Sequence, residues 1–451
     1  MLLIRIAAAA CAVALPASLA AQRYQSLHSF TLHSPNSPGR SIAQSRGGYL
    51  FTTTEDWNNQ LGSAIRVTTG GQVKTVYHFT GSSRIIPRGG LTMGSDGHFY
   101  GTTQWGGANG FGSIFRLTNS GAFSALYSFT GGEDGAYPTD APIESAEGDF
   151  YGVTEGNNNQ GSIFRISTAG KFEVLHSFPA GGNDFPTGPL VQATNFWFYG
   201  TTCSGGANGA GSVFRIDHNG NYSVIHSFNS TDGACPQFGV IQAADGDIYG
   251  VTLQGGSTNS GVLFRMNTQG GSFSVLHEFT GAADGANPCT LVEASDGNIW
   301  GNTVTGGAYN YGALFRITPL GTFAKVYDYD SGNGFNGEYA HLVQHTNGVF
   351  YSDTSSGGPQ NGGVFYSYDA GLSPFVTWEP TYGRVGETVK ILGQGFTAGS
   401  VASFNGVPAT TMVVYSTYLT AVVPSGATSG YITVNTATGT LKSNKVFLVR
   451  P

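Results

Sequence analysis

The side chains best suited to chemistry in this chain are aromatic and charged residues that depart from an otherwise regular repeat. Aromatic rings offer flat apolar faces with a polar handle, which suits sugar rings. Arginine pairs bidentately with carboxylates, so Arg84 and Arg88 could hold uronic acids. The sequence therefore predicts a ligand site formed by Trp57, Arg84, Arg88, Trp105, Tyr137, Glu155, Tyr309 and Tyr311.

Paired carboxylates would allow a second chemistry, the hydrolysis of glycosidic bonds. That reaction needs two carboxyl groups roughly 5 Å apart in retaining enzymes, or roughly 6.5–9.5 Å apart in inverting ones. The candidates are Glu55, Asp56, Glu155 and Glu338. A lyase would instead need a base such as His341 beside an arginine. We favour the simpler interpretation, in which the carboxylates are solvated loop residues and His341 is structural.

Other residues that look functional recur in nearly every unit, which argues for a structural role. An arginine closes a Gly-x-x-Phe-Arg motif, as in Arg116 and Arg265, and a histidine recurs at one strand position, as in His226 and His277. A metal site needs ligands that converge on one point. The Asp-Gly loops lack the dense carboxylate spacing of calcium loops, and no glycine-rich loop precedes a helix that could hold phosphate. We therefore expect no metal site and no cofactor.

Composition favours a turn-rich all-β protein outside the cell. Charged residues make up 10% of the chain and aromatic residues 13%, and there are 69 glycines. A typical soluble domain has about 25% charged residues. The net charge of −7 provides no basic footprint for nucleic acid, so we expect no nucleic-acid partner.

The N-terminus has the features of a signal peptide, which we place at residues 1–21. Arg5 supplies a positive charge, residues 6–15 form a short apolar core, and small residues precede the cleavage point. No apolar run is long enough for a transmembrane segment, so the protein is predicted to be secreted or at the cell surface. At most one internal disulfide can form among the remaining cysteines, Cys203, Cys235 and Cys289, and its pairing stays open.

An internal repeat dominates the sequence. The glycine that opens the Gly-x-x-Phe-Arg element, or the equivalent glycine, recurs with a period close to 50 residues, at Gly62, Gly112, Gly161, Gly211, Gly261, Gly312 and Gly362. A period near 50 built from short strands is typical of propeller blades. The fifth unit shows the four strands, at residues 238–243, 248–252, 262–267 and 272–279, with the tight hairpin Asp245-Gly246 between the first two. These hairpins should open on one face of the ring. The loops between blades, and those between second and third strands, should open on the other.

The two ends of the repeat predict a closed ring. The seventh unit reaches residue 371 without a fourth strand, while residues 24–30 resemble the fourth strands of other units. We therefore assign residues 22–371 to a seven-bladed β-propeller in which residues 24–30 complete blade seven. Short, closely spaced strands predict a small immunoglobulin-like β-sandwich at residues 372–451.

These motifs resemble two known families. The repeat, with its DGAxP, DGxxYG and GxxFR elements, is similar to the bacterial GloVer tandem repeat of exported choice-of-anchor proteins. That resemblance implies an extracellular or surface location and no established activity. The tail resembles an IPT/TIG domain, which implies a spacer or a protein contact. Its matching elements are Gly386, Gly393, Gly395-Phe396, Phe404-Asn405-Gly406 and Val423-Pro424.

The leading functional hypothesis is a non-catalytic platform that binds a glycan, such as a polysaccharide, or a surface protein. The alternative is an extracellular glycoside hydrolase or polysaccharide lyase that uses the loops of one propeller face. A third hypothesis is a structural surface protein without a defined ligand. The regularity of the repeat favours the first and third hypotheses, whereas the residues that depart from the repeat keep the second open.

Overall fold

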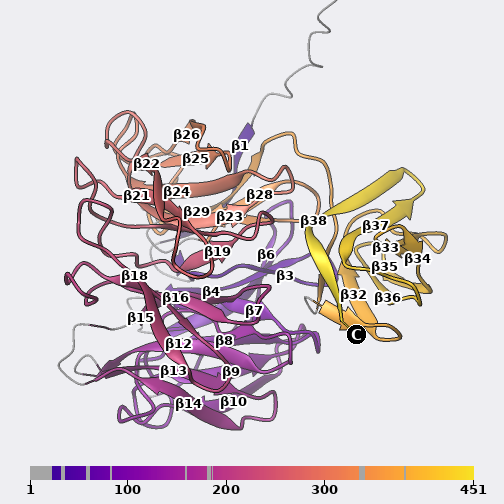
Figure 1. Ribbon diagram of the computed structural model, residues 1–451, viewed down its shortest axis with the longest axis horizontal. Helices are drawn as coiled ribbons and strands as arrows, with labels where there is room; N and C mark the ends of the chain where they lie inside the picture. The colour runs from indigo at the N-terminus through magenta and orange to yellow at the C-terminus, as the bar shows by residue number, and fades with distance from the viewer. Residues whose placement is uncertain are drawn as a thin grey trace, which may run out of the picture.

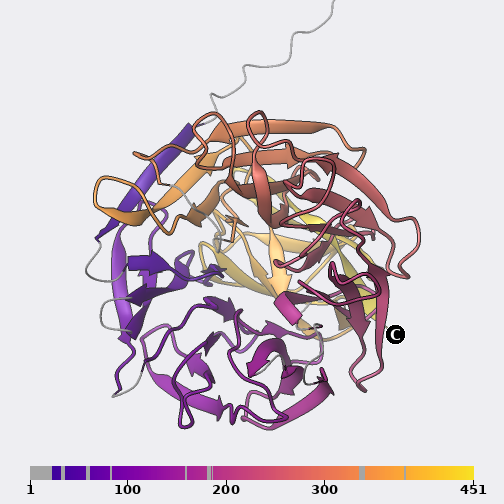
Figure 2. The same cartoon turned by 90° about the vertical axis from the view of Figure 1, so that its left-hand side faces the viewer.

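The computed structural model describes residues 23–31, 36–56, 61–81, 84–157, 160–179, 184, 186–334, 341–379 and 382–450. None of these residues lies in an α-helix, so the described chain is all-β. Antiparallel sheets follow one another and form a ring like that of a β-propeller (Figure 2). The predicted signal peptide lies outside the described residues, as do Trp57 and Glu338.

We number the ring sheets 1 to 7 in chain order. Ring sheet 1 contains β2 (Asn36–Pro38), β3 (Ala43–Gln44), β4 (Leu50–Asp56), β5 (Leu61–Val67) and β6 (Val73–His78). Ring sheet 2 contains β7 (Leu91–Met93), β8 (Phe99–Thr103), β9 (Ser113–Leu117) and β10 (Phe123–Ser128). Ring sheet 3 contains β11 (Ile143–Glu144), β12 (Phe150–Asn157), β13 (Gln160–Ile166) and β14 (Phe172–Ser177).

The remaining ring sheets continue the pattern. Ring sheet 4 contains β15 (Pro186–Gln192), β16 (Phe198–Thr202), β17 (Ser212–Ile216) and β18 (Tyr222–Ser227). Ring sheet 5 contains β19 (Val240–Gln242), β20 (Ile248–Val251), β21 (Val262–Met266) and β22 (Ser274–Glu278). Ring sheet 6 contains β23 (Ala286–Glu293), β24 (Ile299–Thr305), β25 (Ala313–Ile317) and β26 (Phe323–Asp328). Ring sheet 7 contains β27 (Val343–Gln344), β28 (Phe350–Asp353), β29 (Asn361–Asp369) and, from the start of the chain, β1 (Arg23–Thr31).

The two ends of the ring meet in ring sheet 7. Strand β1 pairs antiparallel with β29, with Tyr24 opposite Tyr368. The Tyr24 ring also stacks on Tyr327 of ring sheet 6 at 4.6 Å between centroids. The fourth strand of ring sheet 7 thus comes from the opposite end of the ring's sequence from its other three, which ties the first described residues to the last sheet of the ring.

Repeated histidines and arginines make contacts of a structural kind. The His226 and His277 rings stack on Phe273 and Phe323 of the following ring sheets, at 3.8 and 3.7 Å between centroids. Arg265 pairs with the hairpin carboxylate of Asp247. Each of these side chains therefore joins strands or neighbouring sheets.

After the ring, the chain forms two sheets that pack face to face, which we call the C-terminal unit. The first sheet contains β30 (Thr377–Glu379), β32 (Thr388–Leu392), β36 (Tyr418–Val422) and β35 (Thr411–Tyr415). The second contains β31 (Tyr382–Arg384), β38 (Gly439–Arg450), β37 (Gly430–Thr436), β33 (Val401–Phe404) and β34 (Val407–Pro408). Their core includes the buried side chains of Val389, Phe404, Leu419, Ile432 and Phe447.

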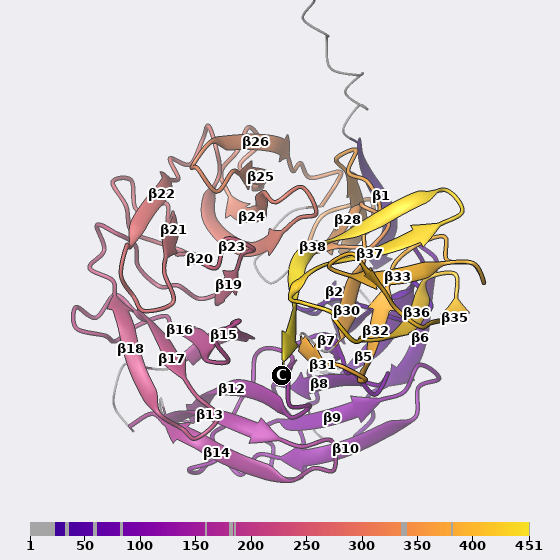
Figure 3. The ribbon, with the colours of Figure 1, turned by 45° about the vertical axis from the view of Figure 1, so that its right-hand side comes forward.

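The C-terminal unit packs against the ring face that carries the tight hairpins (Figures 1 and 3). Contacts reach the hairpin ends of all seven ring sheets, through the pairs Arg46–Glu379, Ser95–Lys390, Glu147–Tyr382, Phe196–Tyr382, Gln242–Lys445, Glu293–Asn444 and Thr346–Gln394. The hairpin of ring sheet 4 shows how closely the ring surface fits the C-terminal unit. Phe196 has a φ of +67° where the other hairpins have glycine, and its ring contacts Tyr382 and the Arg450 guanidinium.

A belt of side chains joins neighbouring ring sheets just inside the hairpins. The belt positions are Gln44, Met93, Glu144, Gln192, Gln242, Glu293 and Gln344. Six of them accept a hydrogen bond from a hairpin N–H of the preceding ring sheet, at 2.7–3.0 Å. The bond from Thr346 to Gln44 closes the circle between ring sheets 7 and 1. Met93 packs instead in an apolar cluster with Leu392 and Tyr418 of the C-terminal unit.

Candidate functional site

The face opposite the C-terminal unit carries the loops between ring sheets and those between second and third strands. We call it the loop face. Three of the predicted site residues meet there. The Arg84 guanidinium lies over the Trp105 ring, 4.9 Å from its centroid, and the Trp105 and Tyr137 rings are 4.4 Å apart. All three side chains are half-buried. They form a continuous aromatic and cationic surface at the junction of ring sheets 2 and 3.

Tyr137 occupies the variable position of the DGAxP motif, and the backbone conformation there sets the direction of its side chain. The same position is left-handed in three units, at Tyr137, Cys235 and Asn287, with φ of +58°, +54° and +56°. Each of these N–H groups donates to a carbonyl at the end of the preceding loop, at 2.8–2.9 Å. The repeat thus holds the backbone constant while the side chain changes. The Tyr137 ring contacts Trp105 at a tilted angle of 43°, and Cys235 forms a disulfide with Cys203.

Next to this surface lies a compact group of buried charges. Arg40 and Asp140 form an ion pair at 3.0 Å, with side chains only 2% and 3% exposed. His341 Nε2 lies 3.8 Å from the other Asp140 oxygen. Gly89 lies between Arg40 and Asp140, just before the first strand of ring sheet 2. A Cβ on Gly89 would lie 2.6 Å from Thr102 Oγ1 and 2.7 Å from the Asp140 carbonyl carbon. The missing side chain leaves room for the pair to join ring sheets 1 and 3.

Glu55 and Glu155 complete the group of charges. Arg88 Nε lies 3.7 Å from Glu55 Oε1. Burial raises the pKa of Glu55 to about 7, against the lowering effect of Arg88, Arg40 and Arg84. Burial also raises the pKa of Glu155, again against Arg40 and Arg88. The two carboxyl groups therefore share the field of the same two guanidinium groups, and near neutral pH Glu55 can hold or release a proton.

The structure brings together most, but not all, of the predicted site residues. Arg84, Trp105 and Tyr137 touch one another, and Arg88 and Glu155 belong to the adjoining charged group. Tyr309 and Tyr311 lie in the loop between β24 and β25 of ring sheet 6, which is not a neighbour of ring sheets 1 to 3. There Tyr309 is 61% exposed, and Tyr311 packs in an apolar cluster with Trp300 and Tyr327. Trp57 lies outside the described residues.

Sequence reasoning missed the Arg40–Asp140 pair and left the disulfide open. A signal for the ion pair was present, because the two residues occupy equivalent repeat positions that are glycine in ring sheets 2 and 4. Cys203 and Cys235 are bonded, and Cys289 is a buried thiol that donates to the Asn302 carbonyl.

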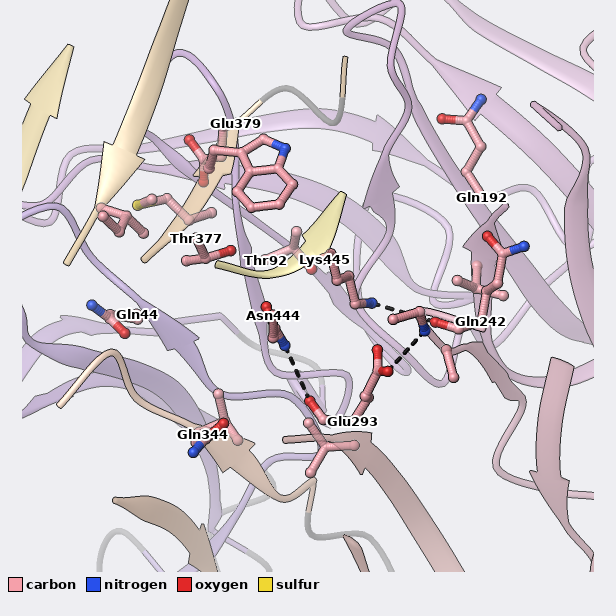
Figure 4. Close-up of a pocket in the computed structure, with 18 of the residues that line it drawn as sticks. Gln44, Thr92, Gln192, Gln242, Glu293, Gln344, Thr377, Glu379, Asn444 and Lys445 are labelled. Atoms are coloured by element: carbon pink, nitrogen blue, oxygen red, sulfur yellow. Dashed lines mark hydrogen bonds between the residues drawn. The ribbon is translucent and has the colours of Figure 1, made fainter. Parts of the chain in front are cut away.

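A second feature was not predicted at all. A cavity of about 690 Å³ lies on the ring axis between the ring and the C-terminal unit (Figure 4), and we call it the axial chamber. A smaller cavity of about 240 Å³ continues along the axis and shares four lining residues with it, Ser41, Thr92, Val191 and His341. The axis is thus hollow from the C-terminal unit to His341, which belongs to the buried group of charges.

Comparison with known proteins identifies the family to which the repeat belongs. The model of the Gloeobacter/Verrucomicrobia repeat matches residues 17–202 and 186–410. No curated protein matches the chain in sequence.

Solved structures show the fold at low identity. A fungal alcohol oxidase of the AA5 family in complex with copper is 12% identical, with a TM-score of 0.52 over 96% of this chain and 100% of that one. The extracellular domain of a putative hybrid two-component system from B. thetaiotaomicron is also 12% identical, with a TM-score of 0.51 over 95% of this chain and 57% of that one. Within the residues that the structure describes here, no group of three or more His, Cys, Asp and Glu side chains could hold a metal ion.

Proposed function

Because the chain belongs to the Gloeobacter/Verrucomicrobia repeat family, we propose that it is an exported seven-bladed β-propeller that binds a glycan without catalysis. In this proposal ring sheets 1 to 7 are the blades, residues 372–451 form an immunoglobulin-like domain of the IPT/TIG kind, and the glycan binds on the loop face. The two sheets of the C-terminal unit and the ring of sheets support this architecture.

Two observations, the N-terminal segment and the disulfide, support export. Residues 1–21 have the charge and apolar core of a signal peptide. The Cys203–Cys235 disulfide suits an oxidising compartment. In the described part of the chain, no helix is long and apolar enough to cross a membrane.

The observation that carries the binding proposal is the contact between Arg84, Trp105 and Tyr137 on the face left open by the C-terminal unit. These residues depart from the repeat, yet they meet at one place. The tilted Trp105–Tyr137 pair offers apolar ring faces for a sugar, and Arg84 adds a cation that pairs with a carboxylate. An acidic polysaccharide, rich in uronic acid, therefore fits this surface better than a neutral one.

The test compares two tryptophans that each lie under an arginine. Trp105→Ala removes the proposed stacking surface, and Trp197→Ala is the matched control because Arg215 lies over the Trp197 ring at 4.6 Å, near the hairpin of ring sheet 4. We expect Trp105→Ala to weaken binding to polyuronate roughly three- to tenfold, the worth of one aromatic contact. Trp197→Ala should bind like the unaltered chain. Equal binding by all three proteins would refute the loop-face site.

A second candidate function rests on the carboxyl groups of Glu55 and Glu155. A glycoside hydrolase needs one carboxyl group that is protonated near neutral pH and one that is ionised. The pKa of Glu55, which burial raises to about 7, meets the first condition. For Glu155, the Arg40 and Arg88 charges oppose the effect of burial on the pKa and would favour the ionised form that the second condition needs. Incubation with neutral and acidic polysaccharides, followed by mass spectrometry, tests this candidate. Products that disappear in both Glu55→Gln and Glu155→Gln would establish hydrolysis. If the unaltered chain releases no products, binding without catalysis is the remaining candidate.

A further inference from the structure

Glutamine is the residue type that best satisfies the hydrogen bonds of the belt between ring sheets. Its side-chain oxygen accepts from the preceding hairpin, and its amide can donate to a carbonyl of its own hairpin. Gln242 and Gln344 make both bonds, with Nε2 at 2.9 and 3.1 Å from the carbonyl oxygens of Gly246 and Gly348. Four of the seven belt positions are glutamine and two are glutamate.

The two glutamates differ in how they use their second oxygen. Glu144 accepts from both the N–H and the hydroxyl of Ser95, each at 2.7 Å, so both oxygens are engaged. Glu293 accepts from Ala244 N–H at 2.8 Å through Oε1, but its buried Oε2 has no hydrogen-bond partner. The residue is only 7% exposed. A buried polar atom without a partner is costly, so the belt does not explain why a carboxylate stands here.

The axial chamber offers a reason. Glu293 lies on its wall, and so does Lys445 from β38 (Figure 4). Lys445 Nζ donates to the Gln242 carbonyl at 3.4 Å. Burial raises the pKa of Glu293, against the lowering effect of the nearby Lys445 charge, yet the Lys445 ammonium does not reach Oε2. Glu379, the other carboxylate of the wall, also has an Oε2 without a hydrogen-bond partner, but the Arg46 guanidinium lies 3.8 Å from that oxygen.

The rest of the lining suits a hydroxylated molecule. Apolar side chains such as Met93, Val292 and Leu342 make up much of the wall. Amides, hydroxyls and an indole ring stand among them, namely Gln44, Thr92, Gln192, Thr377, Trp378 and Asn444. Sugar rings stack on aromatic faces, and each sugar hydroxyl can both donate to a carboxylate and accept from an ammonium. The volume of about 690 Å³ lies within the range of small-molecule sites.

We propose that the axial chamber binds a small neutral sugar or polyol, which donates a hydroxyl hydrogen bond to Glu293 Oε2 and accepts one from Lys445. The ligand is neutral because Glu293 and Lys445 carry opposite charges, and Glu379, the other carboxylate of the wall, already has the Arg46 guanidinium beside it. This site is distinct from the loop-face surface, since the C-terminal unit supplies part of its wall.

The test uses two glutamates of the same belt in the full exported chain. Glu293→Gln keeps the belt bond, as glutamine does at four other positions, and removes the unpaired oxygen. Glu144→Gln is the matched control, because it changes the same residue type in the belt away from the chamber wall. The probes are D-glucose, D-mannose, maltose and myo-inositol, measured by isothermal titration calorimetry and by the melting temperature.

We expect at least one probe to bind and to raise the melting temperature of the unaltered chain. Loss of a hydrogen bond to a charged group should weaken binding of that probe roughly ten- to a hundredfold in Glu293→Gln, and Glu144→Gln should bind normally. Glu293→Gln without ligand should melt no lower than the unaltered chain, because its buried carboxylate is gone.

Two outcomes would overturn the proposal. One is the absence of binding by all four probes at concentrations where a weak sugar site would be filled. The other is equal weakening in Glu293→Gln and Glu144→Gln, which would point to the belt rather than the chamber. Trp105→Ala separates this site from the proposed loop-face site, since it should leave binding of the small probe unchanged.

Discussion

The buried ion pair of Arg40 and Asp140 permits a sharp test of how the loop-face charges are held. Replacing Asp140 by asparagine keeps the shape of the side chain and leaves the Arg40 guanidinium buried without its partner at 3.0 Å. Breaking a buried pair in this way costs about 3–5 kcal/mol in the free energy of unfolding. Glu55 and Glu155 feel the Arg40 charge, so they offset part of the loss and place the expected cost near 3 kcal/mol.

The measurement is urea unfolding followed by tryptophan fluorescence, with Asp247→Asn as the matched control. Asp247 pairs with Arg265 at 2.5 Å, but those side chains are 23% and 31% exposed, and exposed pairs contribute only about 0–1 kcal/mol. The double variant Arg40→Met with Asp140→Leu should recover most of the stability that Asp140→Asn loses, because it buries no unpaired charge. A cost below about 1 kcal/mol for Asp140→Asn, equal to that of the control, would refute the reasoning.

Two further predictions concern Glu55 and Phe196. The folded pKa of Glu55 is about 7, above the unfolded value of about 4.3, so its contribution to stability is greatest below pH 4 and is lost as the pH rises through 7. Glu55→Gln should flatten the fall in unfolding free energy between pH 5 and pH 8 by a few kcal/mol, and parallel pH profiles for the two proteins would contradict this. Phe196→Ala keeps a strained φ of +67° and loses the ring contacts with Tyr382 and Arg450, whereas Phe196→Gly relieves the strain. The alanine variant should therefore unfold in urea about 1 kcal/mol more easily than the glycine variant. A glycine variant less stable than the alanine one would contradict the strain.

Much of the fold could be predicted because the turns and strands of each repeat unit are marked by residues close together in its sequence. The Asp-Gly pairs mark the hairpins, and the observed hairpin glycines have positive φ, as at Gly246. Residues 24–30 resemble the fourth strands of other units, and in the structure β1 pairs with β29. Such patterns depend on residues close in sequence, so they can be recognised without knowing how the sheets meet.

The candidate site was predictable only in part. Departures from the repeat singled out Arg84, Trp105 and Tyr137, and these do meet. The same rule also selected Tyr309 and Tyr311, which lie in ring sheet 6. A departure from a repeat shows that a residue is free of the repeat's own packing, but its partners depend on which ring sheets are neighbours.

What the sequence determined by itself is therefore the unit: its strands, its turns and its period, all of which follow from alternation and from glycine at positions of positive φ. The tertiary structure alone decided what happens between units. It paired Arg40 with Asp140 across Gly89, bonded Cys203 to Cys235, and placed the C-terminal unit over the hairpins so that it forms part of the wall of the axial chamber. The physical reason is that these contacts join residues tens to hundreds of positions apart, and only closure of the ring and docking of the C-terminal unit bring their side chains within reach of one another.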